Sequence, residues 1–290
     1  MINDTLVIDM ELSGDCTAKC PFCPRQYLKR NNKLLTKEKI EIIIRQIEAL
    51  TNDYARITIY FMGRGEPLHN KEGLFFVLKW LQNITKRNTI ETILYTNNSL
   101  LDKEFMRNPL LKQLNKIVIS VAGYNSKNYE KIYGCSWENT LRNIYYLREK
   151  WDPPMSINIA SIDYLKKDKD IPMKEDELSV SCNNAQIPYK RIMHCNLGSI
   201  LYKTQTPNSS EIIQNCDCRV PKYISISCDG LYLFCFADFA QEYALGSVET
   251  IPLEQLIKSS DQGFLKQYFL RFCQYCDAPM RPPARQLDKG

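Results

Sequence analysis

Three cysteines lie within one short stretch of the chain, "CTAKCPFC", at positions 16, 20 and 23. Clustered cysteines in a chain without a secretory signal more often hold metal or do chemistry than form disulfides. A structural zinc site uses four ligands, usually as two pairs, but this loop offers three thiols and no nearby histidine. Three thiolates suit a [4Fe–4S] cluster whose fourth iron stays open for a substrate or cofactor. Zinc, or cysteines clustered by chance, are the alternatives.

Six further cysteines lie between positions 216 and 276. Four thiolates close a cluster fully, and the candidates are Cys218, Cys235, Cys273 and Cys276. Cys235 ends a G-x4-C motif, and "CQYC" contains the last pair. Cys216 competes with Cys218 for the upstream position, and a four-cysteine zinc ribbon is the alternative to a cluster.

The elements that must position these cysteines alternate between apolar strands and amphipathic helices. Such alternation predicts right-handed βαβ units and a parallel sheet. About six units are too few for a closed eight-unit barrel, so the expected fold is α/β, a partial (β/α)6 TIM-like barrel. The expected strands are 5–12, 55–62, 91–96, 116–122, 155–162 and 185–194, and the expected helices are 36–50 (N-capped by Thr36), 72–86, a short one after Asn98, and segments within 126–150.

A second, smaller unit follows a polar connector near residues 199–221. Asp229-Gly230 separates two alternating apolar runs, which is a strong hairpin signal. Segments 251–259 and 263–272 look helical. We therefore divide the chain into residues 1–200, the barrel, and 201–290, a small β-hairpin/helix unit.

Ligands of parallel α/β sheets sit at the carboxyl ends of the strands. The unusual sequences lie there: "GDCTAKCPFC" after the first expected strand, "GRGEP" after the second, "TNN" after the third and "SVAG" at the end of the fourth.

The cysteine loop resembles the signature of the radical S-adenosylmethionine (SAM) superfamily, C-x3-C-x2-C with an aromatic residue, here Phe22, before the third cysteine. "MGRGEP" resembles the superfamily's glycine-rich turn that binds the amino group of SAM. Gly65, Glu66 and Pro67 match it, and Arg64 departs from the usual glycine.

This resemblance implies further contacts to SAM. Asn97 and Ser120 occupy places that hold the ribose and the carboxylate, and Phe22 is expected against the adenine. Many relatives carry an arginine near "KIYG" for the carboxylate. This chain has Tyr133 there, so Arg142 or Lys131 is the expected substitute.

The resemblance also implies the chemistry. A flavodoxin- or ferredoxin-like donor reduces the cluster, SAM splits into methionine and a 5′-deoxyadenosyl radical, and the radical abstracts a hydrogen atom from a substrate carbon.

The second cysteine region resembles the twitch domain, a shortened SPASM domain, and implies one auxiliary [4Fe–4S] cluster. In radical epimerases of similar architecture a free thiol returns a hydrogen atom. The thiols left for that role are Cys135, Cys182, Cys195, Cys228 and whichever of Cys216 and Cys218 is not a ligand. A buried structural cysteine is the other interpretation of each.

Enzymes with such domains suggest maturation of a ribosomally synthesised peptide, by epimerisation, crosslinking or backbone excision. The chain starts at its first expected strand, without the winged-helix peptide-recognition domain of many relatives, so a separate small recognition protein is an expected partner. A small-molecule radical dehydrogenase and a non-catalytic iron–sulfur scaffold are the alternatives.

Composition bounds the remaining possibilities. The net charge of +5 is mild and scattered, which does not indicate nucleic-acid binding. No apolar run approaches the roughly 20 residues of a membrane span, and the N-terminus lacks a signal-peptide pattern. We expect a cytoplasmic protein without membrane association.

Overall fold

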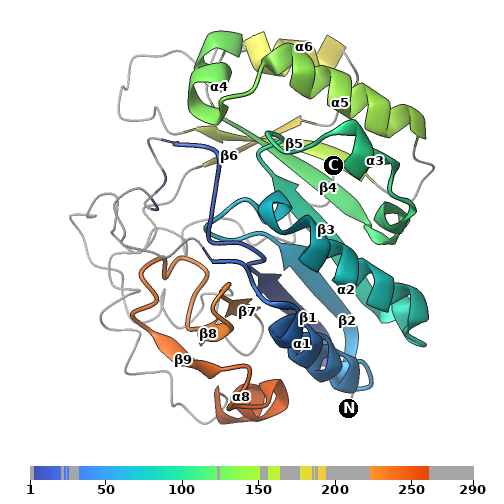
Figure 1. Cartoon of the computed structure of the whole chain (residues 1–290), viewed down its shortest axis with the longest axis vertical. Helices are drawn as coiled ribbons and strands as arrows, with labels where there is room; N and C mark the ends of the chain where they lie inside the picture. Colours follow the sequence, from blue (N-terminus) through green and yellow to red (C-terminus); the bar gives the residue numbers. More distant parts are fainter. Residues whose placement is uncertain are drawn as a thin grey trace.

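The computed structural model describes residues 3–20, 23, 25, 33–122, 125–150, 156–163, 177–184, 186, 189–193 and 223–260. Within these residues one sheet has the strand order β6-β5-β4-β3-β2-β1-β7-β8-β9 (Figure 1). Six consecutive parallel strands form most of it: β1 (Asn3–Met10), β2 (Tyr54–Phe61), β3 (Ile90–Thr96), β4 (Lys116–Ala122), β5 (Ser156–Asp163) and β6 (Tyr189–Met193).

Helices connect these strands as the sequence predicts. They are α1 (Lys37–Leu50), α2 (Lys71–Asn83), α3 (Lys103–Arg107), α4 (Ser126–Tyr133), α5 (Trp137–Lys150) and α6 (Glu177–Asn184), and the last of these was not predicted. The Thr36 side chain accepts a hydrogen bond from the Lys39 amide and caps α1 as expected. The buried residues of α1 are those of its predicted apolar face, Ile40, Ile43, Ile44, Ile47 and Leu50.

The two faces of the sheet differ in chemistry. On β1, Ile8 and Met10 are fully buried in the hydrophobic core that the sheet shares with the helices. Because side chains alternate along a strand, Asp9 points to the opposite, inner face. Tyr60 of β2 and Tyr95 of β3 pack there edge to face, with ring centroids 5.8 Å apart. The inner face thus carries polar and aromatic side chains beside the buried Ile93 and Val118, while the outer face belongs to the main hydrophobic core.

The C-terminal strands continue the same sheet. β7 (Tyr223–Ile226) pairs in parallel with β1, and β8 (Leu231–Leu233) and β9 (Ala244–Ser247) follow antiparallel. The hairpin predicted at Asp229-Gly230 is confirmed, with Gly230 at φ +80° in its turn. It extends the main sheet, whereas the sequence suggested a separate unit; β9 was not predicted.

Helix α8 (Leu253–Ser260) confirms the helix expected after the hairpin. The boundary between residues 200 and 201 and the helix expected at 263–272 lie outside the described residues. No helix in the described part of the chain is both long and apolar enough to cross a bilayer.

Candidate active site

The cysteine loop begins at the carboxyl end of β1, and backbone hydrogen bonds join its two ends. The Gly14 amide donates to the Lys33 carbonyl at 2.8 Å, and the Leu35 amide donates to the Leu12 carbonyl at 2.9 Å. The two ends of the loop therefore run side by side, and the cysteines project beyond the sheet.

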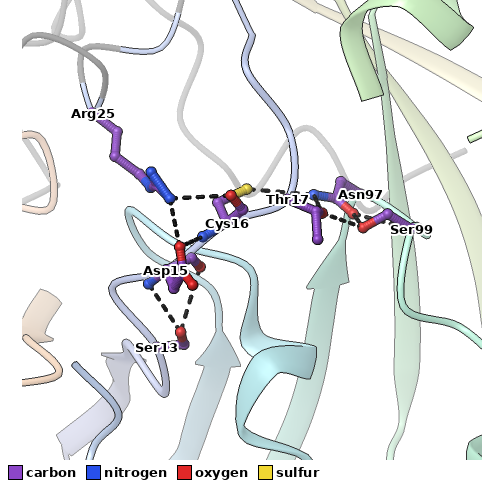
Figure 2. A network of polar contacts seen from close by, with 7 residues as sticks. All are labelled: Ser13, Asp15, Cys16, Thr17, Arg25, Asn97 and Ser99. Atoms are coloured by element: carbon purple, nitrogen blue, oxygen red, sulfur yellow. Dashed lines mark hydrogen bonds and ion pairs between the residues drawn. The ribbon is translucent and has the colours of Figure 1, made fainter. Parts of the chain in front are cut away.

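Asp15 and Arg25 brace the loop from within. The Asp15 carboxylate accepts from the Cys16 amide and from the Arg25 guanidinium, both at 2.8 Å, and the guanidinium also donates to the Cys16 carbonyl at 3.1 Å (Figure 2). Burial opposes ionisation of Asp15, but these two hydrogen bonds hold its pKa below the usual value. Neither residue was singled out from the sequence, since an aspartate and an arginine ten positions apart carry no pattern.

The three thiols lie near one another at the end of this loop. Burial raises the pKa of Cys16 to about 11, and burial followed by the charges of Cys23 and Cys16 raises that of Cys20 further. Among the described residues, no three His, Cys, Asp or Glu side chains converge closely enough to bind a single metal ion. Bound iron would stabilise the thiolates that burial disfavours.

The "GRGEP" turn packs directly against the cysteine loop. The Glu66 amide donates to the Asp15 carbonyl at 2.7 Å. A Cβ atom on Gly65 would lie 2.2 Å from the Ser13 carbonyl oxygen and 2.4 Å from that of Asp15. Only glycine fits at position 65. The absence of a side chain there allows the turn to pack directly against the cysteine loop, as expected for these two motifs.

The Glu66 carboxylate is turned inward. It is 2% exposed and accepts hydrogen bonds from the Asn97 amide at 2.8 Å, the Thr96 hydroxyl at 2.7 Å and the Leu68 amide at 3.2 Å. Burial raises its pKa to about 7, against these three donors. Glu66 therefore joins the turn after β2 to the end of β3, and its carboxylate is occupied by these three donors.

Asn97, predicted to hold the ribose, lies beside the first cysteine. Its Nδ2 donates to the Cys16 Sγ and to the Thr17 hydroxyl, each at 3.4 Å (Figure 2). Ser99 hydrogen-bonds to Asn97 Oδ1 and to the Thr17 hydroxyl. The structure thus brings together the loops after β1, β2 and β3, as the sequence predicts.

Two other predicted SAM contacts lie farther away. Ser120 is half-buried within β4. Arg142 is exposed on α5, hydrogen-bonds to Asn139, and lines a cavity of about 500 Å³ together with Asn98 and Cys135. No interaction in the described part of the chain joins Arg142 to the cysteine loop. Lys131 is exposed on α4, and Phe22 lies outside the described residues.

The remaining predicted cysteines fall into two groups. Cys182 and Cys228 are buried, and Cys135 is half-buried with its Sγ 3.4 Å from the Tyr129 hydroxyl. Cys235 lies two residues after the end of β8 and is buried, and its Sγ accepts from the Ala237 amide at 3.4 Å. Cys195, Cys216, Cys218, Cys273 and Cys276 lie outside the described residues, so the auxiliary ligand set stays a prediction.

Sequence reasoning missed two buried acids on the inner face, Asp9 and Glu11. Each is 1% exposed. Their signal was present: charged residues at alternate positions of an otherwise apolar strand point to one face of the sheet.

Asp9 makes stability depend on pH. Burial raises its pKa from 3.8 to about 8, a rise limited by Arg64 and reinforced by Glu11. The folded state therefore keeps a proton that the unfolded chain loses, and the free energy of unfolding falls as pH rises between those values. In Asp9→Asn this pH-dependent loss should vanish, leaving the variant more stable than the wild type above about pH 8, by at most roughly 6 kcal/mol.

Urea denaturation across that pH range measures this effect. The exposed Asp53 provides a matched control, Asp53→Asn, whose pH profile should follow the wild type. Parallel profiles for Asp9→Asn and the wild type would contradict the prediction.

A parallel α/β sheet carrying three thiols and a glycine-rich turn at the same edge defines an iron–sulfur SAM-binding architecture. The chain matches the family model described as "Radical SAM superfamily" over residues 10–170, more than half its length, and it belongs to that superfamily. It is a radical SAM enzyme, and the family's cofactors are SAM and a [4Fe–4S] cluster.

Known proteins similar to this chain agree with that assignment. A probable GTP 3′,8-cyclase from Methanococcus vannielii is 26% identical over 160 residues, which are 55% of this chain and 50% of the relative; the chain thus matches about half the length of that protein.

Among solved structures, BtrN in complex with AdoMet and 2-DOIA has a TM-score of 0.60 at 18% identity, covering 96% of this chain and 94% of that one. AnSMEcpe with AdoMet has a TM-score of 0.66 at 13% identity, covering 92% and 88%. SuiB from Streptococcus suis, bound to its precursor peptide SuiA, has a TM-score of 0.57 at 17% identity, covering 91% and 67%. At these identities the likeness extends to the fold alone.

Proposed function

We propose that this radical SAM enzyme matures a ribosomally synthesised peptide by removing a hydrogen atom from one of its carbons. Cys16, Cys20 and Cys23 hold the SAM-binding cluster. When bound and reduced, that cluster supplies the electron that splits SAM into methionine and a 5′-deoxyadenosyl radical.

The chain's own residues position this chemistry. Asp15 and Arg25 fix the cysteine loop, and Glu66 fixes the backbone of Asn97. The Asn97 side-chain amide then donates to Cys16 Sγ, and donors of this kind stabilise a thiolate and tune a cluster. The amino group of SAM is assigned in this proposal to the "GRGEP" turn, which packs against the cysteine loop.

The observation that carries the peptide assignment is the inner face of the sheet. Tyr60 and Tyr95 present half-buried rings there, and rings with a polar end are suited to binding peptide segments. SuiB and anSMEcpe, two proteins of this fold, have been solved with peptides bound. A separate recognition protein and a flavodoxin-like electron donor belong to this proposal.

A small-molecule substrate is the second candidate. It is favoured by the partial likeness to a probable GTP 3′,8-cyclase and by the similar fold of BtrN, solved with 2-DOIA.

Anaerobic turnover in deuterated water, followed by mass spectrometry, separates the two candidates. The reconstituted enzyme is incubated with peptides encoded beside its gene or, in parallel, with GTP. Gain of one deuterium by a peptide indicates epimerisation, loss of two hydrogens indicates oxidation or crosslinking, and a larger loss indicates excision. Consumption of GTP with every peptide unchanged would overturn the peptide assignment.

We also propose an auxiliary [4Fe–4S] cluster held by Cys218, Cys235, Cys273 and Cys276. The amide donated to Cys235 Sγ supports a ligand role, because such donors stabilise thiolates. Replacing Cys273 and Cys276 by alanine should lower bound iron from about eight to about four atoms per chain. It should spare SAM cleavage without substrate while impairing substrate turnover. Unchanged iron content in a folded variant would contradict this ligand set.

A further inference from the structure

Arg64 is the residue of the "GRGEP" turn that departs from the superfamily's usual pattern, and its side chain is buried. Its amide donates to Glu11 Oε1 at 2.9 Å, and its Nη1 donates to Glu11 Oε2 at 3.1 Å. Both side chains of this ion pair are 1% exposed. Glu11 also accepts from the Cys228 amide at 3.0 Å, so the carboxylate that orients Arg64 is itself fixed to the turn after β7.

Gly63 allows this arrangement. It has φ +152°, and a Cβ atom there would lie 2.8 Å from the Cβ and Cγ atoms of Glu11. The close approach brings the turn after β2 against the end of β1 and directs Arg64 along the inner face.

One edge of the Arg64 guanidinium is unused. Neither Nε nor Nη2 has a hydrogen-bond partner among the described residues, although both atoms are buried. These two nitrogens form the side-on edge of the planar group, which can donate two parallel hydrogen bonds. Burying donors without partners is unfavourable, so a ligand that accepts from both nitrogens offsets that cost.

A second unpartnered atom belongs to the same cluster. Asp9 lies within electrostatic range of Arg64, and its Oδ2 accepts from the Ser225 hydroxyl at 3.2 Å, while its buried Oδ1 has no partner in the described part of the chain. The Phe239 ring lies over the guanidinium, 5.8 Å from its centroid. The ring covers one face of the group, so the Nε/Nη2 edge is the part of the guanidinium without a partner among the described residues.

We propose that the Nε/Nη2 edge of Arg64 binds a carboxylate group of the substrate on the inner face of the sheet. A planar carboxylate offers two oxygens with the spacing of that edge. Because its pKa is about 8, Asp9 carries a proton at neutral pH and can donate Oδ1–H to the same group.

The surrounding charges favour a monoanion over a phosphate. Glu11 already neutralises Arg64, and the buried Asp238 carboxyl lies within electrostatic range of the same arginine. A dianion would meet repulsion that a carboxylate meets less strongly. The origin of this carboxylate rests on the proposed function. If the substrate is a peptide, the carboxylate belongs to an acidic side chain or to the C-terminus of that peptide.

Difluoroacetate observed by fluorine NMR probes this site on the reconstituted holoenzyme with saturating SAM. The wild type should broaden the probe signal, and acetate should reverse the broadening while acetamide does not. Arg64→Lys keeps the charge but lacks the two-donor edge, and should bind the probe about tenfold more weakly or worse. Arg45→Lys, an exposed arginine on α1, serves as the matched control and should bind as the wild type does.

The double variant Glu11→Gln/Arg64→Met covers the case in which Arg64→Lys fails to fold, because it removes both charges of the pair together. A folded double variant should not bind the probe. Equal binding by the wild type and by either folded Arg64 variant would overturn the proposal.

Displacement of difluoroacetate by competing ligands identifies which molecule supplies the carboxylate. Displacement by acetyl-Ala-Glu-Ala-amide supports an acidic side chain, and displacement by acetyl-Ala-Gln-Ala with a free C-terminus supports the terminal carboxylate. Stronger displacement by inorganic phosphate overturns the assignment to a carboxylate. Displacement by SAM, added to enzyme prepared without it, assigns the edge to SAM and overturns a substrate role. None of these measurements requires turnover, so they stand apart from the test of peptide maturation.

Discussion

Replacing Cys16, Cys20 and Cys23 together by alanine is expected to abolish formation of 5′-deoxyadenosine when the reduced protein meets SAM. Three thiols share the loop that β1, the "GRGEP" turn and Asn97 surround, and burial keeps them protonated unless iron is bound. Without ligands for three of the four irons, the SAM-binding cluster cannot assemble. Chromatography of anaerobic reactions, with iron analysis of the same samples, measures both consequences.

Lys19→Ala is the control for this triple variant. Lys19 lies in the same loop and is exposed, and nothing assigns it a role. It should retain both the iron and the product. Product formation by the folded triple variant at the level of the control would exclude these cysteines as the cluster ligands.

Gly65→Ala should be the most damaging single substitution near the site. Its new Cβ would meet two backbone carbonyl oxygens at 2.2 and 2.4 Å, and backbone atoms cannot rotate away as a side chain can. Overpacking of this kind costs about 1–3 kcal/mol or more. Relief requires moving the cysteine loop away from the turn, so we expect loss of both stability and SAM cleavage.

Gly134→Ala separates this steric effect from the general cost of replacing glycine. Gly134 ends α4 at φ +73°, but its Cβ position has nothing within 4 Å. Its cost should be about 1 kcal/mol from backbone conformation alone, with SAM cleavage retained. Urea denaturation and 5′-deoxyadenosine assays of both variants test this, and equal losses in the two would contradict the steric explanation.

The parts of the fold that were predicted from the sequence have strong local signals. Thr36 followed by isoleucines at helical spacing determines α1, and Asp229-Gly230 determines the hairpin. Helix α6 was missed because "ELSVSCNN" has only a weak apolar face, and β9 because "ALGS" is too short to show alternation. The join of the hairpin to β1 was missed because parallel pairing between distant strands leaves no local pattern.

In the candidate site, too, features with a local sequence signal were predicted and features that depend on distant partners were not. The cysteine spacing and the "GRGEP" turn were recognisable motifs, and the structure confirms that they touch. The inward turn of Glu66 and the burial of Arg64 depend on partners in other strands, Asn97 and Glu11, that no spacing reveals. Arg142 was chosen because it lies near an expected position along the chain, and the structure instead places it beside the cavity next to α5.

The parallel pairing of β7 with β1 has a consequence for synthesis on the ribosome. Asp9 and Ser225, which meet across these strands, are 216 residues apart in the chain. One edge of the first strand therefore stays open, with unpaired backbone groups, until most of the protein has emerged. Translation intermediates should depend on chaperones during that interval. The residues around the cysteine loop should reach their final arrangement only after the β7–β8 hairpin has paired with β1.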